Sequence, residues 1–193
     1  TGPRQVGKTT LIKNICERFG DYLFINGDDA SVRAEFNEPS EKYLRQTIGK
    51  HKLLFIDEAQ RFENIGLILK IIHDQLKGVK VVASGSSALD IVDKTNEPLT
   101  GRKWHFNLFP ISWQELVDYN GYFEAKLTLD QYLIFGTYPE IINNMESAIM
   151  ILQELTNSYL YKDLLQFKGI RKPEILDKLL LALALQVGSE VNF

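Results

Sequence analysis

Apolar residues follow two alternating patterns in the first half of the chain. Short, continuous apolar runs predict buried strands. Between them, apolar residues recur three and four positions apart, which predicts helices. The expected strands cover residues 22–26, 52–57, 79–83 and 104–108. The expected helices cover residues 7–19, 39–48, 62–76 and 88–93. Strands separated by helices predict an α/β fold, with a parallel sheet covered by helices on both faces.

The pattern becomes wholly helical after Pro110. Ser112 and Glu115 have the spacing of a capping box, which predicts a helix start. Further helices are expected over residues 128–135, 140–145, 147–167 and 173–187. We therefore expect an α/β core over residues 1–111 and a helical lid over 112–168. Residues 169–193 would begin a C-terminal domain, with the joint at 168–173.

The chain opens with a glycine-rich motif before its first expected helix. Residues 2–9 match the pattern G-x-x-x-x-G-K-[ST], whose backbone N–H groups converge on a phosphate. Its lysine would contact the β- and γ-phosphates, and its hydroxyl residue would ligate Mg²⁺. The alternative is a glycine-containing turn before an ordinary helix. The expected nucleotide-binding residues are Gly2, Pro3, Arg4, Gln5, Val6, Gly7, Lys8, Thr9 and Thr10.

Two carboxylates follow the apolar strand at 53–56. Asp57, at the strand tip, is expected to hold Mg²⁺ together with Thr9. Glu58 is expected to polarise an attacking water, which suits a hydrolase because a kinase must exclude water. A solvated strand end is the alternative, but a preceding phosphate loop favours the functional interpretation.

Two further residues are candidates for catalysis. Ser86 follows the strand at 79–83, and ligands bind at this end of strands in α/β sheets. The alternative for Ser86 is a Ser/Gly turn. Arg102 follows Gly101 and would offset charge in the transition state, within the chain or from a neighbouring subunit. The alternative for Arg102 is a surface position in a loop.

Composition adds mainly exclusions. The 193 residues carry a net charge of −3, so no overall positive field indicates a nucleic-acid partner. A single cysteine, Cys16, excludes a disulfide within the chain. The longest apolar run is too short to span a bilayer, and no secretory signal is present in the sequence. We expect a cytoplasmic location without membrane association.

These motifs occur in the order seen in one family. The chain resembles prokaryotic AAA-type ATPases that carry an uncharacterised C-terminal domain. The segments that carry the resemblance are residues 2–10, 55–61, 85–87, 99–102, 108–112 with Glu115, and 136–140. Family members usually have Gly-Gly-Tyr/Phe-Pro where this chain has Gly136-Thr137-Tyr138-Pro139, which is a mild departure.

The resemblance implies a P-loop sheet of strand order 5-1-4-3-2 and a helical lid. In this fold a central strand runs directly into the phosphate loop, whereas only Thr1 precedes Gly2 here. We therefore expect the central first strand to be absent, with a gap between the 104–108 and 79–83 strands. We also expect the chain to be truncated at both ends.

The leading functional hypothesis is Mg²⁺-dependent ATP hydrolysis that moves the helical part against a DNA or protein partner, in a monomer or a homo-oligomer. The alternative is a slow nucleotide-dependent switch with little turnover. Glu58 disfavours a small-molecule kinase, as does the lack of an Arg-rich lid. GTP is disfavoured because no Asn-Lys-x-Asp segment follows a strand. Residues 151–193 hold five basic and five acidic residues, which does not support DNA binding there.

Overall fold

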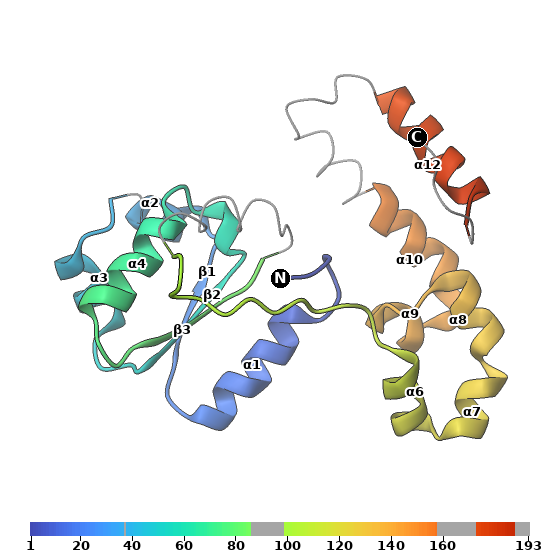
Figure 1. The fold of residues 1–193 in the computed structure, drawn as a ribbon, viewed down its shortest axis with the longest axis horizontal. Helices are drawn as coiled ribbons and strands as arrows, with labels where there is room; N and C mark the ends of the chain where they lie inside the picture. Colours follow the sequence, from blue (N-terminus) through green and yellow to red (C-terminus); the bar gives the residue numbers. More distant parts are fainter. Residues whose placement is uncertain (37, 86–98, 158–172, 188–193) are drawn as a thin grey trace.

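The computed structural model describes residues 1–36, 38–85, 99–157 and 173–187 (Figure 1). An α/β part built around a small sheet comes first in the chain. A second part follows residue 111, and the regular elements within its described residues are all helices. This is the expected fold class.

The sheet of the α/β part has three parallel strands in the order β1-β2-β3. They are β1 (Leu23–Asn26), β2 (Leu53–Asp57) and β3 (Lys80–Ala83), each within one residue of its expected start. Asn26 pairs with Asp57, and Ile56 pairs with Ala83. The carboxyl ends of the strands therefore meet at one edge of the sheet.

The helical segments among the described residues beside this sheet are α1 (Lys8–Phe19), α2 (Ala30–Glu35), α3 (Glu41–Ile48), the 3₁₀ helix η1 (Ala59–Arg61) and α4 (Ile65–Gln75). α3 begins after Pro39 because the Ser40 side chain caps it. α4 begins three residues later than expected because η1 forms first. α2 was not expected: it is too short to show a period, and the Asp29 carboxylate stabilises its start.

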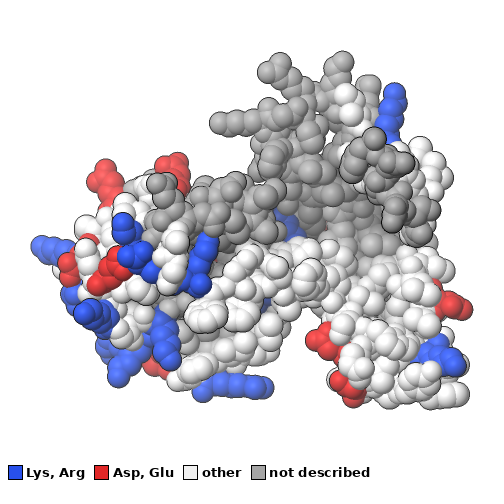
Figure 2. Space-filling model, viewed as in Figure 1, with Lys and Arg blue, Asp and Glu red and all other residues white. Residues whose placement is uncertain are grey.

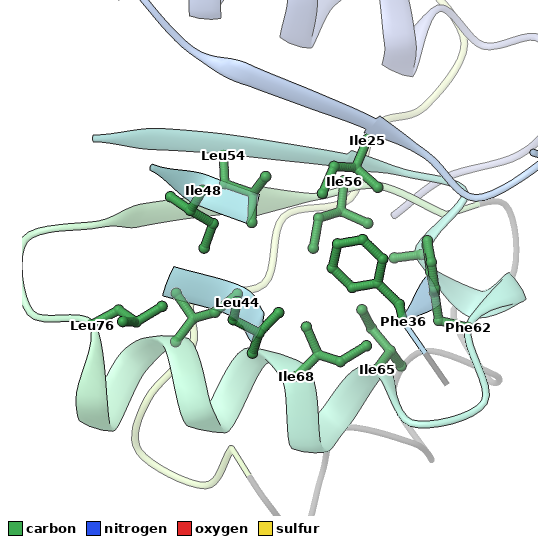
Figure 3. Packing of buried hydrophobic residues seen from close by; sticks show 12 residues of the cluster. Ile25, Phe36, Leu44, Ile48, Leu54, Ile56, Phe62, Ile65, Ile68 and Leu76 are labelled. Atoms are coloured by element: carbon green, nitrogen blue, oxygen red, sulfur yellow. The ribbon is translucent and has the colours of Figure 1, made fainter. Parts of the chain in front are cut away.

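The main core lies between the sheet and helices α3 and α4. Leu54 and Ile56 point toward these helices, where Leu44, Ile48, Ile65, Ile68 and Ile72 are also buried (Figure 3). Phe55 faces the other side of β2 and is also fully buried. A strand buried on both faces is apolar throughout, which explains why its sequence shows no alternation.

The segment 104–108 is not a strand, so that expectation was wrong. Among the described residues, backbone hydrogen bonds join this segment to Thr1, and it belongs to no strand ladder. The Leu108 N–H donates to the Thr1 carbonyl at 2.8 Å, and the Thr1 amino group donates to the Phe106 carbonyl at 2.7 Å. Without a longer neighbour no ladder forms, and Trp104 remains 90% exposed. Thr1 still lies beside this segment, as the first and last strands would in the expected order.

The helical part begins with α6 (Trp113–Asn120), which has both hydrogen bonds of the expected capping box between Ser112 and Glu115. The following elements are α7 (Tyr122–Leu127), α8 (Leu129–Phe135), α9 (Pro139–Asn143), η2 (Met145–Ser147), α10 (Ala148–Leu155) and α12 (Pro173–Leu185). α7 was not expected. The expected helix at 88–93, the continuation of 147–167 beyond residue 157, and most of the 168–173 joint lie outside the described residues.

The helical part meets the α/β part near the glycine-rich loop before α1. The Ile111 N–H donates to the Thr137 carbonyl at 3.0 Å. The Pro139 ring lies close enough that a Cβ added to Gly7 would be 4.0 Å from it. Within the described parts of the chain, no helix combines the length and the apolar character needed to cross a membrane.

Candidate functional site

A cavity of about 330 Å³ opens at the carboxyl ends of the strands. The loop before α1 forms one wall, and the segments that follow β1 and β2 form the other. Its lining residues are Arg4, Gln5, Gly7, Lys8, Thr9, Thr10, Asp28, Glu58 and Arg61. The fold thus brings the glycine-rich motif and the strand-end carboxylate Glu58 into one site.

The loop before α1 has two residues in left-handed conformations. Gly7, at the N-cap of α1, has φ +93°, which a residue with a Cβ rarely adopts. Gln5 has φ +60° in spite of its side chain. Val6 between them is buried, so its side chain is turned away from solvent.

Lys8 is folded back onto its own loop. Its ammonium group donates to the carbonyl oxygens of Gly2 at 3.0 Å and Pro3 at 2.7 Å. The side chain is buried, and this burial lowers the pKa of Lys8. Glu58 and Asp57 oppose the shift, while Arg4 adds to it. A buried cation held only by carbonyl dipoles is suited to exchange them for an anion.

Asp57 is the most enclosed carboxylate of the site. One of its oxygens accepts a hydrogen bond from the Thr9 hydroxyl at 2.7 Å, across 48 positions of sequence. Its other oxygen accepts one from the Ser84 hydroxyl. Both Asp57 and Ser84 are buried. The fold therefore joins the two residues that the sequence suggested as metal ligands.

Ser84 was missed in the sequence analysis, which chose Ser86. Ala83 pairs with Ile56, so the next residue, Ser84, lies opposite Asp57. The register of β3 against β2 is what would have identified Ser84. Ser86 itself lies outside the described residues.

Glu58 directly follows β2 in a left-handed conformation, with φ +49°. The backbone of Gly27, after β1, lies so close that a Cβ there would be 2.4 Å from the Glu58 carbonyl oxygen. The Glu58 carboxylate accepts a hydrogen bond from the Gln60 amide at 2.5 Å. Its backbone and side chain are therefore both held by neighbours.

The donor set of this site suits Mg²⁺. Thr9 and Asp57 offer a hydroxyl and a carboxylate, and Mg²⁺ prefers oxygen ligands. It also keeps several waters and takes one or two protein ligands plus phosphate oxygens. Among the described residues no group of three or more His, Cys, Asp or Glu could hold a metal by itself. A two-ligand site completed by a nucleotide therefore fits the residues present.

Arg102 does not line the cavity. Its Nε atom lies 3.0 Å from an Asp74 carboxylate oxygen, in the last turn of α4. Hydrogen bonds from His73 and Arg102 lower the pKa of Asp74. Because α4 returns the chain from the end of β2 to the start of β3, Arg102 lies at the opposite edge of the sheet from the cavity.

The two parts of the chain match two families. Residues 1–117 match the AAA domain family, and residues 126–193 match a domain of unknown function (DUF8612). The chain is also 31% identical over 103 residues to the uncharacterized proteins Mb2031c of Mycobacterium bovis and Rv2008c of Mycobacterium tuberculosis. This stretch covers 53% of the chain and 22% of each relative.

Proposed function

Because the chain belongs to the AAA domain family, we propose that it binds ATP with Mg²⁺ and hydrolyses the bond between the β- and γ-phosphates. Hydrolysis moves the helical part against a DNA or protein partner. The family supports a nucleotide-binding, AAA-like function. Hydrolysis, the metal and the partner are our proposals, since the relatives are uncharacterized and the match spans about a fifth of their length.

The observation that carries the proposal is the hydrogen bond between Thr9 and Asp57. A glycine-containing turn before an ordinary helix would have no reason to bury a carboxylate beside its hydroxyl. A solvated strand end would leave Asp57 exposed, whereas it is buried. A shared metal ligand set explains both the burial and the pairing.

In this proposal Lys8, Thr9, Asp57 and Glu58 each have one role, and the loop backbone has another. Lys8 exchanges the carbonyl groups of Gly2 and Pro3 for phosphate oxygens, and the loop N–H groups hold the remaining phosphates. Thr9 and Asp57 hold Mg²⁺, which when bound neutralises phosphate charge. Glu58 accepts the proton of the attacking water as the bond between the β- and γ-phosphates breaks.

Two more roles are proposed, for Ser86, which lies outside the described residues, and for Arg102, which does not line the cavity. Ser86 would hydrogen-bond the γ-phosphate or the attacking water. Arg102 would supply positive charge to the transition state of a neighbouring copy, because it lies at the sheet edge opposite its own cavity. Such a role requires a homo-oligomer.

The charge of the helical part bears on the partner. Residues 112–193 contain six basic and eleven acidic residues, and the stretch 112–157 holds one of the basic residues, Lys126, and seven of the acidic ones. Figure 2 shows most of the visible basic side chains over the α/β part. An acidic surface repels a phosphate backbone, so this part favours a protein partner over DNA.

The test uses the full-length natural protein. We expect Lys8→Ala to abolish ATP binding, measured by titration calorimetry with Mg²⁺. We expect Glu58→Gln to bind ATP as the wild type does and to lose about 100-fold or more in turnover, as befits the loss of a general base.

Glu63→Gln is the matched control, because it removes the same charge from an exposed side chain that does not line the cavity. Retained micromolar affinity in Lys8→Ala would contradict the phosphate-loop assignment. Equal turnover in Glu58→Gln and Glu63→Gln would contradict the role of Glu58.

A slow nucleotide-dependent switch is the second candidate, and the contact between Gln60 and Glu58 favours it. A glutamate whose carboxylate is held at 2.5 Å by an amide is not oriented for water. Single-turnover measurements separate the two functions. A motor hydrolyses bound ATP within seconds in the presence of its partner, whereas a switch retains ATP for minutes. If the contact with Gln60 slows the switch, the Gln60→Ala variant hydrolyses bound ATP faster than the wild type.

A further inference from the structure

We propose that Arg61 is a second phosphate-binding cation of this site, specific for the γ-phosphate. In the free protein Asp28 forms an ion pair with Arg61, and this pair separates when a nucleoside triphosphate binds. This inference rests on the proposed function of nucleotide binding. It adds a residue that discriminates between triphosphate and diphosphate.

The position of Arg61 is fixed by the same turn that positions Glu58. Arg61 is the last residue of η1, and its N–H donates to the Glu58 carbonyl at 2.9 Å. Both side chains line the cavity together with Lys8 and Thr9. A guanidinium three residues beyond Glu58 therefore lies on the Glu58 side of the cavity, where water and the terminal phosphate would meet.

The present partner of Arg61 is Asp28, which follows β1. The Arg61 Nε atom lies 3.3 Å from an Asp28 carboxylate oxygen, and the two side chains are 42% and 58% exposed. An ion pair this open to water contributes little to stability. A triphosphate offers more negative charge and pairs of oxygens that match the guanidinium fork. The pair is thus weak enough to exchange.

The charges around the cavity give Asp28 a role as well. The wall carries three basic side chains, Arg4, Lys8 and Arg61, and two acidic ones, Asp28 and Glu58. While Asp28 is paired with Arg61, it neutralises the charge of the Arg61 guanidinium. When Arg61 turns to the terminal phosphate, that neutralisation ends. A diphosphate lacks the terminal group and leaves the pair intact, so only the triphosphate gains from Arg61.

The simpler interpretation is a surface ion pair with no ligand. It is distinguishable because the chain contains another exposed pair, Arg45 with Glu41 at 2.7 Å on α3, which does not line the cavity. Variants of that pair provide matched controls with the same charge changes.

The experiment is a calorimetric titration of the full-length protein with ATP and separately with ADP, both with Mg²⁺. Glu58→Gln serves as the background, to prevent hydrolysis during the titration. We expect Arg61→Ala to weaken ATP binding by about tenfold, as for the loss of one hydrogen bond to a charged group, and ADP binding by less than about twofold. Asp28→Asn should tighten ATP binding by about threefold and leave ADP binding unchanged. Arg45→Ala and Glu41→Gln should change neither affinity.

The double variant Arg61→Ala with Asp28→Asn tests whether Asp28 acts by pairing with Arg61. If Asp28 acts by holding Arg61, Asp28→Asn has no effect once Arg61 is absent. A persisting threefold gain would show that Asp28 acts only through its own charge and would overturn this role. Equal losses of ATP and ADP affinity in Arg61→Ala would overturn the γ-phosphate contact. If the Glu58→Gln protein binds ADP but the Arg61 variants do not behave as expected, only the proposed role of Arg61 is contradicted. If the Glu58→Gln protein binds neither ATP nor ADP, the proposed function is contradicted as well.

Discussion

The ammonium group of Lys8 is bound by two carbonyl oxygens of its own loop and lies in a buried position. Burial lowers the pKa of this group in the free protein. A bound phosphate would replace neutral carbonyl groups by anionic oxygens and would raise the same pKa. Proton binding and nucleotide binding are therefore coupled at Lys8.

The coupling predicts how affinity depends on pH. Nucleotide binds the protonated form, so ATP affinity should be constant below the lowered pKa of Lys8 in the free protein. It should fall as pH rises through that pKa, by up to about tenfold per pH unit, until the raised pKa of the complex is reached. Titrations from about pH 7 to 10.5, the ordinary lysine range, measure this fall. Lys8→Arg stays charged throughout and should lose the slope, whatever its affinity; a flat profile for the wild type would contradict the coupling.

Some residues of the candidate site could be predicted from the sequence, and others could not. Lys8, Thr9 and Asp57 belong to motifs whose spacing implies a phosphate and a metal, and the fold brings them together. Ser84 could not be chosen over Ser86 without the register of β3 against β2. The contact between Arg61 and Asp28 joins two loops that follow different strands, so no local pattern indicates it.

At the scale of elements, the strand ends are tied together by backbone hydrogen bonds. The Gly27 N–H donates to the Asp57 carbonyl at 2.8 Å, and the Ala59 N–H donates to the Ser84 carbonyl at 2.8 Å. These contacts hold the loop after β1 against the turn that carries Glu58. Gly27 has no side chain to separate them.

Gly27→Ala should therefore damage catalysis more than binding. Its Cβ would meet the carbonyl oxygens of Glu58 at 2.4 Å and Asp57 at 2.9 Å, so the turn must shift. We expect a destabilisation of about 1–3 kcal/mol and a fall in kcat of about tenfold or more, with a smaller change in ATP affinity. Thermal unfolding, steady-state kinetics and calorimetry measure the three quantities.

Gly78→Ala is the control for stability alone. Gly78 has φ +97°, so alanine is strained there, but no atom lies within 4 Å of the added Cβ. It lies between α4 and β3, at the sheet edge away from the cavity. If both variants reduced kcat by the same factor, Gly27 would have no specific effect on the site.

The elements were predictable where pattern and capping agreed. β2, α1 and α6 follow from continuous apolar runs, helical spacing and the capping box. α2 and η1 were not found because segments of six and three residues have no period. The 104–108 segment has the composition of a strand. A strand also requires a neighbouring strand to pair with, and the composition of a segment does not show whether one is present.

At the scale of the whole molecule, the helical part contacts the α/β part beside the phosphate loop. Pro139 lies near Gly7, and the Ile111 N–H donates to the Thr137 carbonyl. If the proposed phosphate contact moves this loop, the movement would act directly on the start of α9. This contact is the physical link through which nucleotide would move the helical part.

The link predicts a change in hydrogen exchange at the junction. We expect Mg²⁺–ATP to slow exchange of the Ile111 amide in the full-length protein, because an ordered loop stabilises its hydrogen bond to Thr137. Mass spectrometry of exchanged peptides covering residue 111 measures this. Lys8→Ala should show no slowing, and slowing of equal size in that variant would contradict transmission through the loop.

The pairing of Arg102 with Asp74 has a consequence for symmetry. The arginine and the cavity lie at opposite edges of one sheet, so they are different surfaces of the same molecule. If an interface holds only one contact between the Arg102 of one copy and the cavity of its neighbour, that contact is heterologous, not the self-complementary contact of a two-fold dimer. Heterologous contacts between identical copies either close into a cyclic ring or continue as a helical filament. An arginine that reaches its neighbour through such an interface therefore implies a ring or a helical filament, whereas a two-fold dimer would need antiparallel copies, with both contacts between Arg102 and a cavity in one interface.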